Sequence, residues 1–263
     1  MVWPEKVFNA QNRGTNMLRP IPKDDFVRRF RLKASLRALE RVRKTIGERA
    51  YQRLRDLVVF RLEGREFEID KVGEKIVVAY SGGSDSTATL KILRWAGFEV
   101  IPVMARLPQL REPVVLKATM EGAILVDVPG YMEEMKRLIE KRAPICGRCH
   151  SMVMKAVESY ALDNGIKIVA SGDLLSFGSA SIYEKGSIIV LNLPAFLTLT
   201  KAEAIKILGR KYALGFGCPL WRSATKRAPI LKRFGIQRIL RELRAGALTE
   251  DMAKVLIMDV LRA

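Results

Sequence analysis

A run of six small and polar residues is the strongest chemical signal in the sequence. It consists of Ser81, Gly82, Gly83, Ser84, Asp85 and Ser86. Glycines let backbone amides approach an anion closely, and a helix expected to start here adds unpaired N–H groups and a partial positive charge. Asp85 can cap that helix or help to hold a magnesium ion. The run therefore predicts a phosphate-binding loop.

Three cysteines, Cys146, Cys149 and Cys218, are the second signal. An odd number, in a chain for which we expect no secretion signal, argues against a disulfide framework. A Cys-x-x-Cys pair can put two thiolates on one metal, and a distant third cysteine can join it through the fold. His150, the only histidine, directly follows Cys149 and is awkwardly placed as a fourth ligand. We interpret the cysteines as metal or redox groups.

Other interpretations of these cysteines stay open. Cys-x-x-Cys-His is also the attachment pattern of c-type haem, which belongs outside the cytosol. The pair Cys146 and Cys149 could instead cycle as a disulfide or carry a persulfide, because a helix start favours thiolate. All three could also be buried structural residues.

Hydrophobic periodicity predicts the elements that position these groups. Residues 76–80 form a short apolar strand of the kind buried in a parallel sheet, directly before the predicted loop. Further strands are expected at 99–104, 123–128, 166–170 and 187–191, and helices at 85–95, 130–141, 150–163 and 200–209. This alternation predicts a doubly wound, mostly parallel α/β sheet.

The flanking segments have different patterns. Apolar residues at steps of three or four predict helices from Asp25 onward, and short alternating runs on either side of Gly64 predict a small hairpin. Two helices are expected over 229–262, with Gly246 between them.

These patterns divide the chain into three parts. We expect a basic helical N-terminal appendage with the hairpin at 1–72, a catalytic domain at 73–225, and C-terminal helices at 226–263.

Positive charge is concentrated in two segments. The chain has 46 Lys and Arg against 28 Asp and Glu, a net charge of +18, of which residues 1–56 contribute +9 and residues 221–244 contribute +7. Clustered positive charge favours a nucleic acid, because each neutralised phosphate releases counterions; the alternative is an ordinary solvated helix face. Trp3, Trp221 and Phe234 are candidates for stacking on an unpaired base, or ordinary core aromatics.

Membrane association is not expected. No stretch approaches the ~20 apolar residues of a membrane span, and residues 1–5 lack the apolar core of a signal peptide. We expect a cytoplasmic protein, and a homodimer is compatible with the sequence.

The run at 81–86 closely resembles the SGGxDS signature of the pyrophosphate-loop ATPases and lacks the lysine of the common NTPase loop. The resemblance spans roughly residues 75–225. It implies an adenine nucleotide alpha hydrolase-like fold that uses ATP and Mg²⁺, adenylates a carbonyl oxygen and releases pyrophosphate. The implied ATP-binding residues are Ala79, Tyr80, Ser81, Gly82, Gly83, Ser84, Asp85, Ser86, Met104, Ala105 and Gly172.

The turn Ser171-Gly172-Asp173 occupies the place where many relatives have a longer TGHNxDD motif. Asp173 is therefore a candidate catalytic or magnesium-holding carboxylate beside Asp85, and the alternative is an aspartate that caps a turn.

The cysteines extend the resemblance to tRNA thiolases that make 2-thiouridine or 2-thiocytidine. In those enzymes three cysteines hold a [4Fe–4S] cluster with one open iron, so the resemblance implies Cys146, Cys149 and Cys218 as cluster ligands. It implies tRNA as a partner, with sulfur supplied as sulfide or by a carrier protein.

A second resemblance, from Gly172 to Glu203, is to the 4-thiouridine synthetases, in which a lysine follows the sheet in a similar way. It makes Lys201 a catalytic candidate that would neutralise charge on phosphate; the alternative is an exposed lysine at a helix start. We therefore expect a tRNA thiolase without naming the modified atom.

Three rival functions remain. The same loop occurs in ligases that form amide or other nitrogen bonds on a nucleotide or small molecule, but those need no thiolates. A sulfurtransferase that uses a persulfide needs no cluster. An RNA-binding module with a degenerate loop is disfavoured, because Gly82, Gly83, Asp85 and Ser86 are intact.

Overall fold

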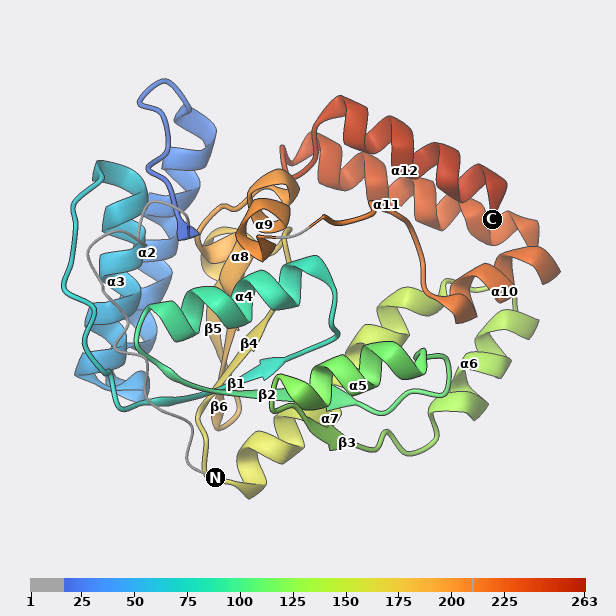
Figure 1. Ribbon diagram of the computed structural model, residues 1–263, viewed down its shortest axis with the longest axis horizontal. Coiled ribbons are helices and arrows are strands. Elements are labelled where there is room, and N and C mark those ends of the chain that lie inside the picture. The colour runs from blue at the N-terminus through green and yellow to red at the C-terminus, as the bar shows by residue number, and fades with distance from the viewer. Residues whose placement is uncertain (1–16, 210) are drawn as a thin grey trace.

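A six-stranded sheet lies at the centre of the computed structural model, which describes residues 17–209 and 211–263 (Figure 1). Its strand order is β3-β2-β1-β4-β6-β5. The strands are β1 (Lys75–Ala79), β2 (Glu99–Ala105), β3 (Ile124–Val126), β4 (Ile168–Ser171), β5 (Ile182–Lys185) and β6 (Ile188–Asn192). Only the β5–β6 pair is antiparallel in this sheet. The predicted mostly parallel α/β class is confirmed, although β5 was not predicted.

Helices cover both faces of the sheet. They are α2 (Phe26–Ile46), α3 (Glu48–Glu63), α4 (Ser84–Trp95), α5 (Glu112–Met120), α6 (Tyr131–Glu140), α7 (Ile145–Asp163), α8 (Leu193–Phe196), α9 (Lys201–Leu208), α10 (Pro219–Arg227), α11 (Lys232–Arg244) and α12 (Glu250–Arg262). Alternate β1 residues serve opposite faces: Val77 packs with Val157 of α7, whereas Ile76 packs with Ile92 of α4. None of the helices in the described part of the chain has the length and apolar character needed to cross a bilayer.

The sheet has a topological switch between β1 and β4. From β1 the chain runs outward through β2 and β3, and then returns to β4 on the other side of β1. The paired residues Val78 and Ala170 bring the carboxyl ends of the two strands level. Crevices of this kind are where open α/β sheets bind ligands, and the predicted loop and the Gly172 turn both begin there.

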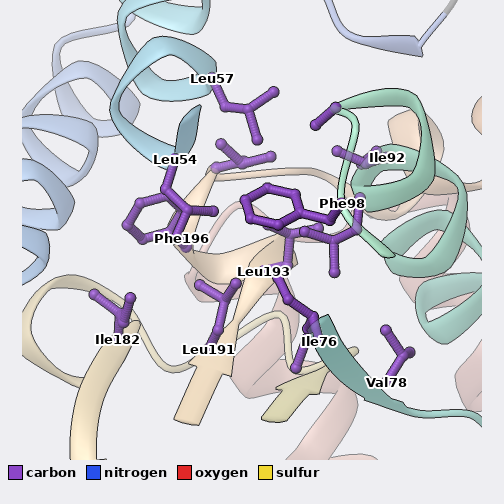
Figure 2. Close-up of a cluster of buried hydrophobic side chains, with 14 of the residues drawn as sticks. Leu54, Leu57, Ile76, Val78, Ile92, Phe98, Ile182, Leu191, Leu193 and Phe196 are labelled. Atoms are coloured by element: carbon purple, nitrogen blue, oxygen red, sulfur yellow. The ribbon is translucent and has the colours of Figure 1, made fainter. Parts of the chain in front are cut away.

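The N-terminal helices share the main core with the sheet. Leu54 and Leu57 of α3 lie against Ile76 of β1, Leu191 of β6 and Phe196 of α8 (Figure 2). In the described residues, α2 and α3 thus share one apolar core with the sheet. The division of the chain at residue 72 stays a prediction.

The predicted hairpin is wrong. Val58 and Leu62 belong to α3, which ends at a left-handed Gly64. A short alternating run also fits a helix when residues three or four positions away are apolar, as Leu54 and Leu57 are. The single apolar stripe after Asp25 is split into two helices at Gly47, where φ is 82°.

The C-terminal helices form a second core. Two helices on either side of Gly246 occur as predicted, and the unpredicted α10 joins them. Trp221 of α10, Ile239 of α11 and Leu256 of α12 pack together with Tyr131 of α6 and Ile145 of α7. Figure 1 shows α10 at one end of the long axis and α2 and α3 at the other, with the sheet between them.

Candidate active site

The predicted phosphate-binding loop connects β1 to α4 and leaves the helix N-terminus uncapped. Gly83 occupies the N-cap position without a side-chain hydrogen bond, so the first amides of α4 have no competing side-chain acceptor. Gly82 has φ 72°, a conformation that favours glycine. Inside the loop, Ser86 Oγ accepts a hydrogen bond from the Ser81 amide at 3.2 Å. The loop is thus shaped by its own side chains, while the first amides of α4 stay available to an anion.

Gly172 lies directly against this loop. A Cβ atom on Gly172 would come within 2.8 Å of the Ser86 amide nitrogen and 3.2 Å of Asp85 Cβ. Any side chain here would displace the start of α4, so the glycine is required by the close approach of the turn after β4 to the loop after β1. The predicted association of Gly172 with the loop therefore has a steric basis.

Lys201 and Asp85 form an ion pair at the centre of the site. Lys201 Nζ donates to both carboxylate oxygens of Asp85, at 2.9 and 2.8 Å. Their side chains are only 15% and 22% exposed. Lys201 is thus not an exposed surface lysine, and Asp85 does not cap α4, because Gly83 holds the cap position. The structure brings these two catalytic candidates together.

Helix α9 is held in place by a capping box and by arginines from the N-terminal helices. Thr200 caps α9 and bonds reciprocally with Glu203. The Glu203 carboxylate also accepts hydrogen bonds from Arg28 Nη2 of α2 at 2.6 Å and from Arg61 Nη1 of α3 at 3.0 Å. Burial acts to raise the pKa of Glu203, but the two arginines outweigh it and hold the pKa at about 2. Helices α2 and α3 therefore fix the start of the helix that carries Lys201.

Asp173 caps the turn that follows β4. Its carboxylate accepts hydrogen bonds from the Leu175 amide at 2.6 Å and from the Ser176 hydroxyl at 2.8 Å. This is the turn-capping alternative given by the sequence, yet the residue also lines the cavity next to the loop. A catalytic or magnesium-holding role for Asp173 stays a prediction.

One large cavity joins the loop to the cysteine region. Its volume is about 900 Å³, and its lining includes Ser81, Asp85, Lys201 and Gly172 on one side and Cys146 on the other. The phosphate-binding loop and one of the three cysteines, Cys146, therefore face a common space.

The two paired cysteines lie within the first five residues of α7, although the sequence pattern predicted them before the helix. Their spacing of three residues puts Cys146 and Cys149 on one helical face, where both are half-buried. Cys218 is exposed and forms the N-cap of α10. The preceding Gly217 has φ 78°, and a Cβ there would clash with the Trp221 ring. Close packing at Gly217 thus fixes the position of Cys218.

The thiols act on one another electrostatically. Burial raises the pKa of Cys146 to about 11, with further effects from Arg238, which lowers it, and from Cys218, which raises it. Burial also raises the pKa of Cys149, and Cys218 adds to that shift. Cys218 therefore affects the pKa of both cysteines of the pair.

Tyr131 donates a hydrogen bond to one of these sulfurs. Its hydroxyl lies 3.1 Å from Cys149 Sγ and accepts from Gln109 Nε2 at 2.6 Å. Burial, together with the Cys149 contact, raises the pKa of Tyr131 well above its ordinary value, so the hydroxyl keeps its proton for the sulfur. No pattern in the sequence indicates this tyrosine, because Tyr131 is on α6 and its partner Cys149 is on α7.

The cysteines suit an iron–sulfur cluster in kind. Three thiolates without a fourth leave one position open, and a cluster spreads its ligands over several irons. The site is less suited to a single metal ion, because no three His, Cys, Asp or Glu side chains within 17–209 and 211–263 lie close enough to bind one together. Cluster binding by Cys146, Cys149 and Cys218 stays a prediction.

Other predicted contacts have mixed outcomes. Met104 and Ala105 are buried and do not line the cavity, so their contact with adenine stays a prediction. Trp221 is 2% exposed and packs edge-on against Phe216 with ring centroids 4.9 Å apart, which makes it a core aromatic. Phe234 lines the cavity and stays available for stacking. Trp3 lies outside the described residues.

Arg238 of α11 also lines the cavity and was not singled out in the sequence. Its Nε donates to Glu242 at 2.9 Å, four residues along the helix. Burial lowers the pKa of Arg238, but Glu242, Cys146 and Asp85 together raise it above its ordinary value. The only signal in the sequence was the Arg-to-Glu spacing of four residues.

Comparison with curated proteins gives one relative of similar length. The chain is 35% identical over 248 residues to the uncharacterized protein MJ1638 of Methanocaldococcus jannaschii, and the match covers 89% of this chain and 94% of that protein. The chain belongs to the MJ1638 family. Membership in this family does not indicate an activity, because that relative is uncharacterized. No protein-family model matches this member of the MJ1638 family.

Among solved structures, one similar chain is the U34-tRNA thiolase NcsA from Methanococcus maripaludis with its [4Fe–4S] cluster. The identity is 14%, the TM-score is 0.39, and the match covers 89% of this chain and 79% of that chain. A similarity this low does not indicate the activity of this MJ1638-family chain.

Proposed function

We propose that the protein is an ATP-dependent tRNA sulfurtransferase. A carbonyl oxygen of a nucleobase attacks the α-phosphorus of ATP, and pyrophosphate leaves. Sulfide then attacks the activated carbon, the carbon–oxygen bond breaks, and AMP leaves with the former base oxygen. No net oxidation or reduction is needed when sulfide is the nucleophile.

The observation that carries the proposal is the shared cavity. The loop at 81–86 and Cys146 line the same space of about 900 Å³. An amide-forming ligase would need the loop but no thiols beside it. A cavity with both supports activation and sulfur transfer on one substrate.

The nucleotide half of the site would work by electrostatics. The uncapped N-terminus of α4 suits the β- and γ-phosphates. Asp85 would hold magnesium, and Lys201, now 2.8 Å from that carboxylate, would turn to a phosphate oxygen. Fixed charges of this kind stabilise the charge that develops on the phosphates.

The sulfur half would be held by Cys146, Cys149 and Cys218. The chemistry that a bound [4Fe–4S] cluster would supply is a Lewis-acidic iron with an open position. Tyr131 would orient Cys149 through the hydrogen bond to its sulfur, since such outer contacts fix ligand geometry.

The tRNA would bind across both basic segments. α2, in the segment 1–56, and α10, in the segment 221–244, lie at opposite ends of the long axis (Figure 1). A tRNA is large enough to contact the basic residues at both ends, which supports tRNA as the substrate. Binding should weaken steeply with salt.

A persulfide route is the second candidate, favoured by one observation. Within the described residues no three potential ligands are close enough to share an ion, whereas Cys146 and Cys149 lie three residues apart on one helix. In this route a cysteine persulfide supplies the sulfur, and a second cysteine thiolate closes a disulfide that an external thiol must reduce.

The test is anaerobic purification with iron and sulfide analysis and an absorption spectrum, for the wild type beside Cys146→Ala. About four irons and four sulfides per chain, absent from the variant, would support the cluster-dependent enzyme. ATP-dependent incorporation of labelled sulfide into tRNA is then measured on the same preparations.

The outcomes separate the candidates. Sulfur transfer without iron after anaerobic reconstitution would favour the persulfide route. Pyrophosphate release that depends on tRNA, without sulfur incorporation under either condition, would refute sulfur transfer and leave the ligase class.

A further inference from the structure

We propose that Arg238 binds the α-phosphate of the nucleotide and of the adenylated base. This inference rests on the proposed function and assigns a substrate contact to a helix outside the predicted catalytic domain.

Arg238 lines the same cavity as Asp85 of the loop and Cys146 of α7. Its guanidinium is within electrostatic range of the Asp85 carboxylate in the loop and of the Cys146 thiol on α7. Arg238 therefore faces the cavity that the phosphate-binding loop and Cys146 share.

The proposed reaction requires the α-phosphate to bind in the same cavity. The loop would bind the β- and γ-phosphates, and sulfur must reach a carbon joined through oxygen to the α-phosphorus. The α-phosphate thus has to lie between the loop and Cys146, in the cavity that Arg238 also lines.

The guanidinium is prepared for such a contact. Glu242, with its side chain 12% exposed, holds Nε of Arg238 at 2.9 Å. The two terminal nitrogens make no hydrogen bond to the described residues, and the side chain is 52% exposed. A guanidinium held at one nitrogen presents the other two as a fork that matches phosphate oxygens.

The helix itself is anchored beside Lys201. The Lys201 amide donates a hydrogen bond, 2.8 Å long, to the carbonyl of Ala247 in the turn after α11. Arg31 of α2 donates to the Ala245 carbonyl at 2.6 Å. Arg238 and Lys201 are thus carried by elements bonded to each other, and their separation is fixed by backbone contacts.

The experiment measures dissociation constants of α,β-methylene-ATP, AMP and pyrophosphate by calorimetry on the full chain. Arg238→Met should weaken AMP binding about tenfold, the loss of one charged hydrogen-bonding group, and leave pyrophosphate binding within about twofold. Arg238→Lys, which keeps the charge without the fork, should lie between. Lys254→Met on α12, with its side chain 72% exposed, is the matched control and should change none of the three constants.

Three results would overturn the proposal. In the first, AMP binds Arg238→Met and Arg238→Lys as tightly as it binds the wild type. In the second, AMP and pyrophosphate weaken equally in Arg238→Lys, which would show a general loss of the site. In the third, the wild type binds none of the three ligands, which would refute the proposed function as well and so is distinct from the first two.

Discussion

Arg61 Nη1 lies 3.0 Å from Glu203 Oε1, and the arginine side chain is only 1% exposed. This pair connects α3 to the first turn of α9, two residues beyond Lys201. A buried guanidinium is tolerated only with charge and hydrogen-bond partners, and Arg61 also donates to the Leu197 carbonyl at 3.2 Å. Besides contributing positive charge, the N-terminal helices therefore hold α9, the helix that carries Lys201, in position.

The pair gives a pH dependence of stability. The folded pKa of Glu203 is about 2, below its ordinary 4.5. Its contribution, on the order of 3 kcal/mol, is therefore complete above about pH 4.5 and lost as pH falls toward 2. Urea unfolding at pH 5 and pH 3 should show a smaller acid loss for Glu203→Gln than for the wild type, and equal losses would contradict the assignment.

Replacing Lys201 should abolish turnover without unfolding the chain. Lys201→Met leaves Asp85 without its cation and the phosphates without a neutralising charge, so ATP-dependent pyrophosphate release should fall by about 10²–10³. Lys206→Met, at an exposed position of the same helix, is the control. Equal rates for the two variants would show that the Lys201–Asp85 pair is only structural.

Adding one methyl group at Gly172 should damage the nucleotide loop. In Gly172→Ala the new carbon would lie 2.8 Å from the Ser86 amide nitrogen, so α4 must shift. We expect a loss of about 1–3 kcal/mol in unfolding free energy together with weaker ATP binding. Gly215→Ala is the control, because its Cβ would meet only Asp259 Oδ2 at 3.5 Å. Normal ATP binding by Gly172→Ala would refute the close approach.

Removing the Tyr131 hydroxyl should make Cys149 less reactive. Burial raises the pKa of Cys149 and the Tyr131 hydrogen bond lowers it. Tyr131→Phe should therefore raise that pKa, reduce the thiolate fraction at pH 8 and slow alkylation of Cys149 in the metal-free protein several-fold. Mass spectrometry of the alkylated peptide measures the rate, with Tyr183→Phe on β5 as control. An unchanged rate would show that the contact does not influence the sulfur.

Several features could be predicted from sequence because they are local. The loop at 81–86 is a continuous run, and the strands around it are short apolar segments whose type is set by their own side chains. The Cys-x-x-Cys pair and the two basic segments are likewise visible without any fold. The hairpin failed for the same reason, since alternation over a few residues near Gly64 fits more than one backbone.

The tertiary structure decided which distant groups meet. Lys201 reaches Asp85 across 116 positions, and Gly172 touches Ser86 because β1 and β4 pair in parallel with their carboxyl ends level. Arg238 enters the same cavity from α11. Such contacts depend on strand order and helix packing, whose free energy comes from apolar burial spread over the whole core, and no short segment encodes them.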